Sequence, residues 1–260
     1  MIENIIKEIQ LIQEQCGHRM LWFRGHNNTN YKLNSGLHRI TSNKEKLRVW
    51  ENQLYNSFLN YGDFYCKQFH EHKAWNTLFL MQHYGLYTRL LDWTDSLMTA
   101  LYFATYEKKD QDACIWVLDP IMMNRECIGL YEGEDIRNIN INILALETLP
   151  KNILNPTRYF EDNLLEIGSF AMIPRRNNDR LVSQNGFFIV QGTRECSVEE
   201  EYQGGINRFL FKINIPKDLV QEIRKYTLLN GINYYALYGG IEGLCKYLKD
   251  EMLGIELNNL

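Results

Sequence analysis

The sequence predicts a single α+β domain in which a mixed central sheet is surrounded by helices. Three observations favour this class. The chain has 260 residues, of which 45% are hydrophobic and 23% charged, and this composition is typical of a globular protein with a sizeable core. Segments with helical spacing of apolar residues and short β-like runs both occur along the chain. No repeat, low-complexity segment or linker rich in proline, glycine or serine divides it, so we expect one domain over residues 1–260.

Helices in the first part of the chain are predicted from the spacing of apolar residues. Residues 2–16 place isoleucines at helical spacing, and this helix is expected to end at Gly17. Asn43 can cap a long helix that continues to Phe69. The inner face of this helix is expected to contain Leu47, Trp50, Leu54, Phe58 and Tyr61. Another helix runs from about Ala74 to Gly85, which is a suitable residue just after a helix end.

Strands are predicted from short apolar runs. Residues 20–24 form such a run that stops at Arg24 and Gly25, and residues 26–42 are expected to be a loop. Further strands are expected at 89–92, 113–118, 170–173, 186–190 and 209–215. Thr94 and Asp95 are good N-caps for a helix after residue 96, and two more helices are predicted at 217–229 and 240–252. Residues 120–165 predict no long element.

The composition disfavours some classes of protein and some kinds of binding site. With 28 basic and 32 acidic residues, a globally basic nucleic-acid binder is disfavoured, while a local basic cleft stays open. Arg175, Arg176 and Arg180 form one local cluster, which is more simply interpreted as a solvated loop. The six cysteines are widely spaced, which predicts reduced thiols and no bound metal. We expect a cytoplasmic protein without a membrane partner, because the N-terminus lacks a signal pattern and no apolar run approaches ~20 residues.

The first candidate site is the segment from Trp22 to His26. An arginine at the end of an apolar strand can direct its five donors towards a cleft, which suits phosphate or carboxylate. Arg24 is placed in this way, and Gly25 would let backbone or ligand approach closely. The alternative is a structural arginine that caps a sheet edge and pairs with a buried carboxylate.

The second candidate site is the segment from Gln82 to Asp95, which concentrates polar and aromatic residues. Taken singly, each residue has a plain structural interpretation, such as a salt bridge between Arg89 and Asp92. Together they form a loop that leads into a helix N-terminus, where backbone donors and the helix dipole favour anions.

Four segments make a recognisable set of motifs. They are Trp22-Phe23-Arg24-Gly25-His26 with Leu37-His38-Arg39, Gln82-His83-Tyr84-Gly85 to Trp93-Thr94 with Ala100 to Ala104, Arg180 to Phe188, and Ile232 to Tyr247. This set, spanning about residues 20–250, resembles the FRG domain family, which is named for its Phe-Arg-Gly motif. Two departures lie in loops: Tyr87 stands where the family usually has proline, and Asn34-Ser35-Gly36 replaces a Pro-Ser-type step.

The order of these motifs also resembles ADP-ribosyltransferases of the Arg-Ser-Glu type. This resemblance implies an ADP-ribosyltransferase-like fold, NAD as the substrate, and Arg24, Asp92 and Gln184 as the catalytic residues. The residues that it implies for NAD binding are Arg24, Gly25, His26, Tyr31, Thr94, Ser96 and Tyr102. Residues that would contact the target are Gln82, His83, Tyr84 and Arg89.

The chemistry of NAD cleavage points to Asp92 as the charged group. Cleavage of the nicotinamide–ribose bond builds positive charge on the sugar, which a carboxylate stabilises better than an amide. Gln184 can bond ribose hydroxyls but carries no charge, so Asp92, aligned by Arg89, is the best candidate. The acidic run of Glu195 and Glu199 to Glu201 is more simply a solvated loop.

Three functions stay open at this point. The first is an NAD-dependent ADP-ribosyltransferase, a toxin or antiviral effector that acts on a protein or nucleic acid and that an antitoxin could bind. The second is a non-catalytic module that binds a nucleotide. The third is a metal-assisted hydrolase or nuclease that uses His83 and Asp92. The motif order favours the first.

Overall fold

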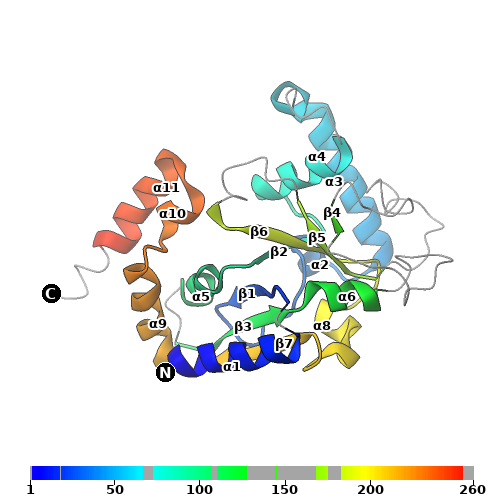
Figure 1. Ribbon diagram of the computed structural model, residues 1–260. Helices are drawn as coiled ribbons and strands as arrows, with labels where there is room; N and C mark the ends of the chain where they lie inside the picture. The colour runs from blue at the N-terminus through cyan, green and yellow to red at the C-terminus, as the bar shows by residue number, and fades with distance from the viewer. Residues whose placement is uncertain are drawn as a thin grey trace.

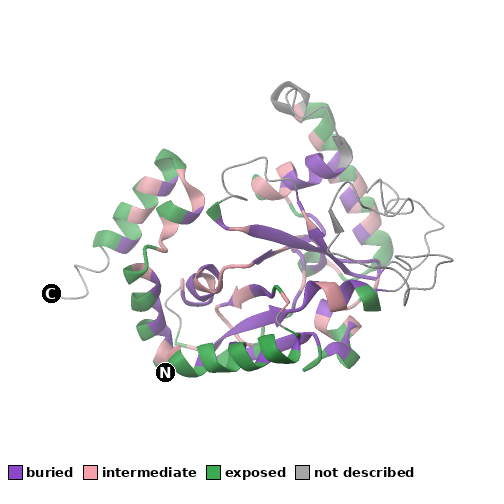
Figure 2. Cartoon of the chain, in the orientation of Figure 1, coloured by how far each residue is buried: buried purple, intermediate pink, exposed green. Residues whose placement is uncertain are grey.

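The computed structural model describes residues 2–17, 19–66, 73–106, 110–127, 144–145, 168–174 and 183–253. Helices surround a central sheet, and most of the strand residues whose burial is described are buried (Figures 1 and 2). The strands are β1 (Trp22–His26), β2 (Leu90–Thr94), β3 (Ala113–Leu118), β4 (Leu144–Ala145), β5 (Phe170–Ile173), β6 (Gly186–Val190) and β7 (Leu210–Ile215). This arrangement confirms the predicted α+β class.

The sheet is mixed, with the strand order β4-β5-β6-β2-β1-β3-β7. β4 and β5 are parallel, and the other neighbouring strands are antiparallel. β1 lies inside the sheet, which confirms that the first apolar run forms a central strand. The prediction that Arg24 ends this strand is wrong, because β1 continues to His26 and pairs with β3 along its whole length.

β1 and β2 separate from each other after a short contact. Within residues 22–26 and 90–94, both fully described, the only pair in register is Phe23 with Thr94. By contrast, β1 has five residue pairs with β3, and β2 has five with β6. The sheet therefore opens between Arg24 and Asp92, where side chains can enter in place of a backbone ladder.

Two sets of helices cover the two halves of the sheet. α1 (Ile2–Gln15), α5 (Leu97–Thr105) and α9 (Lys217–Leu229) pack on β1, β3 and β7 through an apolar cluster that includes Ile9, Ile115 and Ile223. α3 (Lys44–Cys66) and α4 (Lys73–His83) pack on β2, β5 and β6 through a cluster that includes Tyr55 and Phe79. The helical periodicity of the sequence is thus explained by burial of one face of each helix.

The remaining described helices are short. They are α2 (Gly36–Ile40), α6 (Pro120–Glu126), α8 (Val198–Glu201), η5 (Gln203–Gly205), α10 (Tyr234–Tyr238), α11 (Gly240–Lys246) and η6 (Tyr247–Met252), a π-helical segment. In the described part of the chain, no helix has both the length and the apolar character needed to cross a membrane.

Several local predictions fail because a polar side chain makes a capping hydrogen bond, which the spacing of apolar residues does not reveal. The expected loop 26–42 contains α2, since the Ser35 side chain accepts from the backbone N–H of His38. The acidic run after Glu195 is a helix, α8, in which Ser197 and Glu200 form a capping box. Ser96 caps α5 instead of Thr94 and Asp95.

Other predictions are refined at the ends of elements. Tyr61 is 87% exposed and is not on the inner face of α3, because that face ends one turn earlier. Asn43 does cap α3, accepting from the N–H of Lys46 at 2.9 Å.

The end of α4 is as predicted, because Gly85 just after it has a φ of +81°, which is typical of a residue that follows a helix end. α6 was not predicted, and Asp119 caps it. Residues 67–69 and the arginines at 175, 176 and 180 lie outside the described residues.

Candidate functional site

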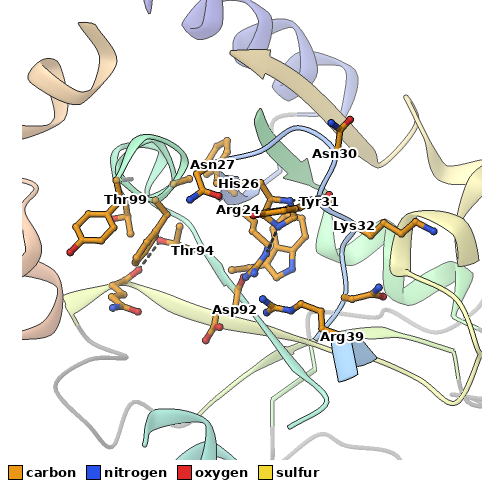
Figure 3. A pocket seen from close by; sticks show the side chains of 18 of the residues that line it. Arg24, His26, Asn27, Asn30, Tyr31, Lys32, Arg39, Asp92, Thr94 and Thr99 are labelled. Carbon is orange, nitrogen blue, oxygen red and sulfur yellow. Dashed lines mark hydrogen bonds between the residues drawn. The ribbon is translucent and has the colours of Figure 1, made fainter. Parts of the chain in front are cut away.

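A cavity of about 730 Å³ opens where β1 and β2 separate (Figure 3). Its walls come from β1, the following segment to α2, β2, α5, the turn before β6, and α10. The lining residues are Phe23, Arg24, Gly25, His26, Asn27, Asn30, Tyr31, Lys32, Asn34, Arg39, Asp92, Trp93, Thr94, Thr99, Ala100, Phe103, Tyr106, Gln184 and Tyr238. The structure therefore brings Arg24, Asp92 and Gln184 to one cavity, as the sequence predicted.

Arg24 lies at the centre of this cavity and is held by neutral acceptors. Its Nη1 donates to the backbone carbonyl of Asp92, and its Nε donates to Nε2 of His26 at 3.0 Å. Within the described ranges Arg24 forms no ion pair, so the alternative of an arginine paired with a buried carboxylate is wrong. Burial lowers the pKa of Arg24 to about 10, an effect that Asp92 opposes. Arg24 thus keeps its charge at neutral pH without a carboxylate partner.

His26 orients Arg24 as a neutral imidazole. Because the Arg24 guanidinium can only donate, Nε2 of His26 must accept, and Nδ1 then carries the proton and donates to the Tyr31 carbonyl at 3.2 Å. Burial, followed by the charge of Arg24, lowers the pKa of His26 to about 3. His26 is therefore uncharged at neutral pH and adds no repulsion to an arginine that it contacts.

Asp92 is fixed by a chain of hydrogen bonds from α4. The Thr88 hydroxyl donates to Oε1 of Gln82 at 2.6 Å, and Nε2 of Gln82 donates to Oδ2 of Asp92 at 2.9 Å. Thr88 sets the direction of the Gln82 amide, so that its NH₂ group faces the carboxylate. Gln82, which was expected to contact a target, is placed to orient Asp92.

Arg89 does not align Asp92, and that prediction is wrong. Its guanidinium pairs with both carboxylate oxygens of Glu51 on α3, with the Nε–Oε1 distance at 2.7 Å. The two side chains are only 4% and 1% exposed. Arg89 also donates to the carbonyl of Gln191 at 2.9 Å. It is a structural residue that ties β2 to α3.

The glycine of the Phe-Arg-Gly motif is required by packing. A Cβ atom on Gly25 would lie 1.9 Å from the carbonyl oxygen of Ala100 and 2.6 Å from the N of Ala104. Only glycine lets α5 approach β1 this closely. The close approach expected at Gly25 is therefore that of the α5 backbone.

The side chains of the turn between β2 and α5 mainly form hydrogen bonds within the protein. Thr94 lines the cavity, but its hydroxyl donates to the Gln184 carbonyl at 2.7 Å and accepts from the N–H of Ser96. Ser96 caps α5 and does not line the cavity. The side-chain amide of Gln184 donates to the carbonyl of Leu237 at 3.2 Å, which joins the turn before β6 to α10.

Tyr102, His83 and Tyr84 lie outside the cavity lining. Tyr102 is fully buried, and its hydroxyl donates to Glu251 at 2.6 Å, so it does not reach the position expected for NAD binding. His83 and Tyr84 meet edge to face, with ring centroids 4.9 Å apart. Tyr84 is largely exposed.

Arg39 and Lys32 are cavity residues that the sequence analysis did not select. The Arg39 side chain is exposed on α2, and in the described part of the chain no hydrogen bond or ion pair of its guanidinium is found. Lys32 forms an exposed ion pair with Glu200 at 2.6 Å. Asp92 is the one acidic side chain among the described lining residues. Arg39 could have been found from the sequence, because it belongs to Leu37-His38-Arg39 in the first motif. The spacing of apolar residues alone does not take the charge of its side chain into account.

Potential metal ligands do not cluster in the described ranges, where no group of three His, Cys, Asp or Glu side chains comes together.

Comparison with known proteins identifies one family. No curated protein and no solved structure matched the chain. Residues 19–113 match the family model described as the FRG domain. The matched segment contains β1, α2, α3, α4, β2 and α5, and hence Arg24, Arg39 and Asp92. The chain therefore carries an FRG domain, and β1 and β2 of that domain form two walls of the cavity.

Proposed function

We propose that the cavity binds NAD and that the protein transfers ADP-ribose from NAD to a macromolecular acceptor. The observation that carries this proposal is the meeting of Arg24, Arg39 and Asp92 in one cavity of about 730 Å³. Such a volume suits a nucleotide-sized ligand. Two guanidinium groups that form no ion pair with any described carboxylate suit a pyrophosphate, which arginine binds through paired hydrogen bonds.

Asp92 supplies the charge that the reaction needs. The bond between the ribose C1′ and the nicotinamide nitrogen breaks, and its electron pair leaves with nicotinamide, which departs as a neutral molecule. The ribose then carries positive charge until an acceptor oxygen or nitrogen attacks C1′ and loses its proton to solvent or a base. A carboxylate held in place before the reaction stabilises this charge without reorganisation. Gln82 holds Asp92 in this way, and Gln184 provides an amide for ribose hydroxyls.

The acceptor and the setting follow from the same proposal. A transferase of this kind would act as a toxin or an antiviral effector on a protein or nucleic acid. It would work in the cytoplasm, where NAD is available, and an antitoxin that occupies the cavity would inhibit it.

Release of nicotinamide from NAD tests the proposal. Asp92→Asn keeps the shape and hydrogen bonds of the side chain but removes its charge, so release should fall about a hundredfold while NAD affinity changes little. Gln184→Glu adds a carboxylate to the same cavity and should raise the rate. Asp95→Asn is the matched control, because Asp95 is close in sequence but does not line the cavity. An equal loss in the Asp92 and Asp95 variants would contradict the role of Asp92.

A non-catalytic nucleotide-binding module is the second candidate. It is favoured by Gln184, an amide at the position where the resemblance implies a glutamate, and by the single acidic residue in the described lining. Binding of NAD by the wild-type protein, with no nicotinamide released in the presence of any acceptor, would decide for this candidate.

A further inference from the structure

Four tyrosines from two distant parts of the chain form a continuous column of rings. Tyr102 and Tyr106 belong to α5 and its end, and Tyr234 and Tyr238 belong to α10. Successive ring centroids are 5.3 Å apart for Tyr102–Tyr106, 5.8 Å for Tyr106–Tyr234 and 4.1 Å for Tyr234–Tyr238. The last pair is stacked with an interplanar angle of 10°. We call this set the aromatic column.

Two cations and one buried carboxylate hold the aromatic column in place. The Arg224 guanidinium carbon lies 4.3 Å from the ring centroid of Tyr102, and Nζ of Lys246 lies 4.8 Å from that of Tyr234. Glu251, only 4% exposed, accepts from the Tyr102 hydroxyl, from Nη2 of Arg224 and from the N–H of Tyr234. One carboxylate therefore joins α5, α9 and α10, which makes the column rigid before any ligand binds.

The aromatic column reaches the cavity at two of its members. Tyr106 and Tyr238 line the cavity together with Phe103. α10 is also fastened to the turn before β6, because the Leu237 carbonyl accepts from Oγ of Ser183 at 2.8 Å and from the Gln184 amide.

The lining residues Arg39 and Lys32 lie on the opposite side of Arg24 from the lining residues of α5. Figure 3 shows Thr99 of α5 on one side of Arg24, and Arg39 and Lys32 on the other. Phe103 and Tyr106 follow Thr99 along α5 by one and two turns. The cavity therefore has a cationic side at Arg39 and an aromatic side at Tyr106 and Tyr238.

We propose that the aromatic side is a stacking subsite for the heteroaromatic base of the bound nucleotide, with Tyr238, the end member of the aromatic column, as its main contact. The inference rests on the proposed function, since it assigns one base of NAD to this side while the phosphates lie at Arg24 and Arg39. A planar base gains from stacking on a ring that is already fixed, because little conformational freedom is lost on binding. Adenine and nicotinamide share this chemistry, and the experiment separates them.

Affinities for a ligand series test the subsite. The ligands are NAD, AMP, nicotinamide mononucleotide and ribose 5-phosphate, which lacks a base. Tyr238→Ala should weaken NAD and one of the two mononucleotides about tenfold, and leave ribose 5-phosphate unchanged. The weakened mononucleotide identifies the base. Tyr238→Phe keeps the ring and should keep the affinity.

The controls separate stacking from folding. Tyr235→Ala removes a partly exposed tyrosine from the same helix, outside the cavity lining, and should change no affinity. Tyr238→Leu fills much of the space without a ring, so it should behave as Tyr238→Ala does even if the alanine variant folds poorly. All affinities are measured below the thermal midpoint of each variant.

The outcomes distinguish this inference from the function on which it rests. Equal weakening of ribose 5-phosphate, or no weakening of either mononucleotide, overturns the subsite and leaves NAD cleavage standing. Tyr238-dependent binding of a mononucleotide without nicotinamide release supports the subsite and removes the transferase. Failure of wild type to bind any of the four ligands overturns both.

Discussion

Two arginines on neighbouring strands differ in what holds them. Arg89, just before β2, pairs with both oxygens of the buried Glu51 carboxylate. Arg24, in the middle of β1, bonds a backbone carbonyl and a neutral imidazole, with no ion pair to any carboxylate in the described ranges. Both belong to motifs that carry the FRG resemblance, and from the sequence alone either could bind an anion.

The difference shows that the charge of the partner separates a structural arginine from a binding arginine. An arginine that is neutralised by a buried carboxylate has little left to offer an anionic ligand, and removing its partner leaves an uncompensated charge in the core. An arginine held by neutral acceptors is oriented but retains its full charge for a ligand. Each prediction below tests one side of this contrast.

The largest effect is expected at the structural arginine. Glu51→Gln leaves Arg89 buried without its counter-charge, and the free energy of unfolding should fall by about 3–5 kcal/mol. Urea denaturation measures this change. Glu45→Gln on the same helix alters an exposed carboxylate and should cost less than about 1 kcal/mol. If the two variants were equally stable, the Arg89–Glu51 pair would not be a structural tie.

A smaller effect is expected on the pH dependence of stability. Burial, and then the charge of Arg24, lowers the pKa of His26 to about 3, below its usual 6.5. The unfolded chain therefore binds a proton that the folded chain does not, and stability from this group is present above pH 6.5 and is lost as the pH falls from 6.5 towards 3. At pH 5 the loss should be about 2 kcal/mol.

His26→Gln isolates this contribution, because an amide can still accept from Arg24 and donate to Tyr31 but does not titrate. The measurement is the change in unfolding free energy between pH 7.5 and pH 5. This change should be smaller in the variant than in wild type by about 2 kcal/mol. An unchanged acid sensitivity would mean that His26 is protonated without cost. His38, whose pKa burial and Arg89 also lower to about 3, contributes acid sensitivity to both proteins.

The smallest effect on stability, with a clear effect on binding, is expected at Arg24. Arg24→Lys keeps the charge but cannot form the planar, paired contacts of a guanidinium, so NAD affinity should fall about tenfold. The thermal midpoint should change little, since the two acceptors that lose their donor, the His26 ring and the Asp92 carbonyl, belong to residues that line the cavity. Arg208→Lys, at an exposed ion pair with Glu126, should change neither quantity. A large drop in the Arg24 midpoint with unchanged affinity would make Arg24 a structural arginine like Arg89.

Local pattern predicted much of the fold. The strands at 113–118, 170–173 and 186–190 and the helix at 217–229 match the structure at both ends. These segments are bounded by turn residues or by proline. The helix buries one face, whereas the strands at 113–118 and 186–190 are continuous apolar runs that are buried on both faces. Arg24, Asp92 and Gln184, which the motif order suggested as one site, do line one cavity, and their catalytic roles stay a prediction.

Contacts between distant residues could not be predicted in the same way. Glu51 lies 38 residues before Arg89, and Glu251 lies 149 residues after Tyr102, so no local spacing connects either pair. Asp92 was close enough in sequence to Arg89 to suggest a salt bridge between them. In the structure Arg89 pairs with the distant Glu51 instead. Tyr102 was assigned to NAD binding from the resemblance in motif order, which carries no information on its distant partner Glu251.

The single register pair between β1 and β2 leaves little backbone pairing to join the two sides of the sheet at this point. A nucleotide bound as proposed, with contacts to both Arg24 and Asp92, would bridge the two sides. Its binding energy would then stabilise β1 and β2 against local opening. Backbone amides of β1 and β2 should accordingly exchange with solvent deuterium more slowly once the cavity is filled, while those of the β3–β7 ladder should not change.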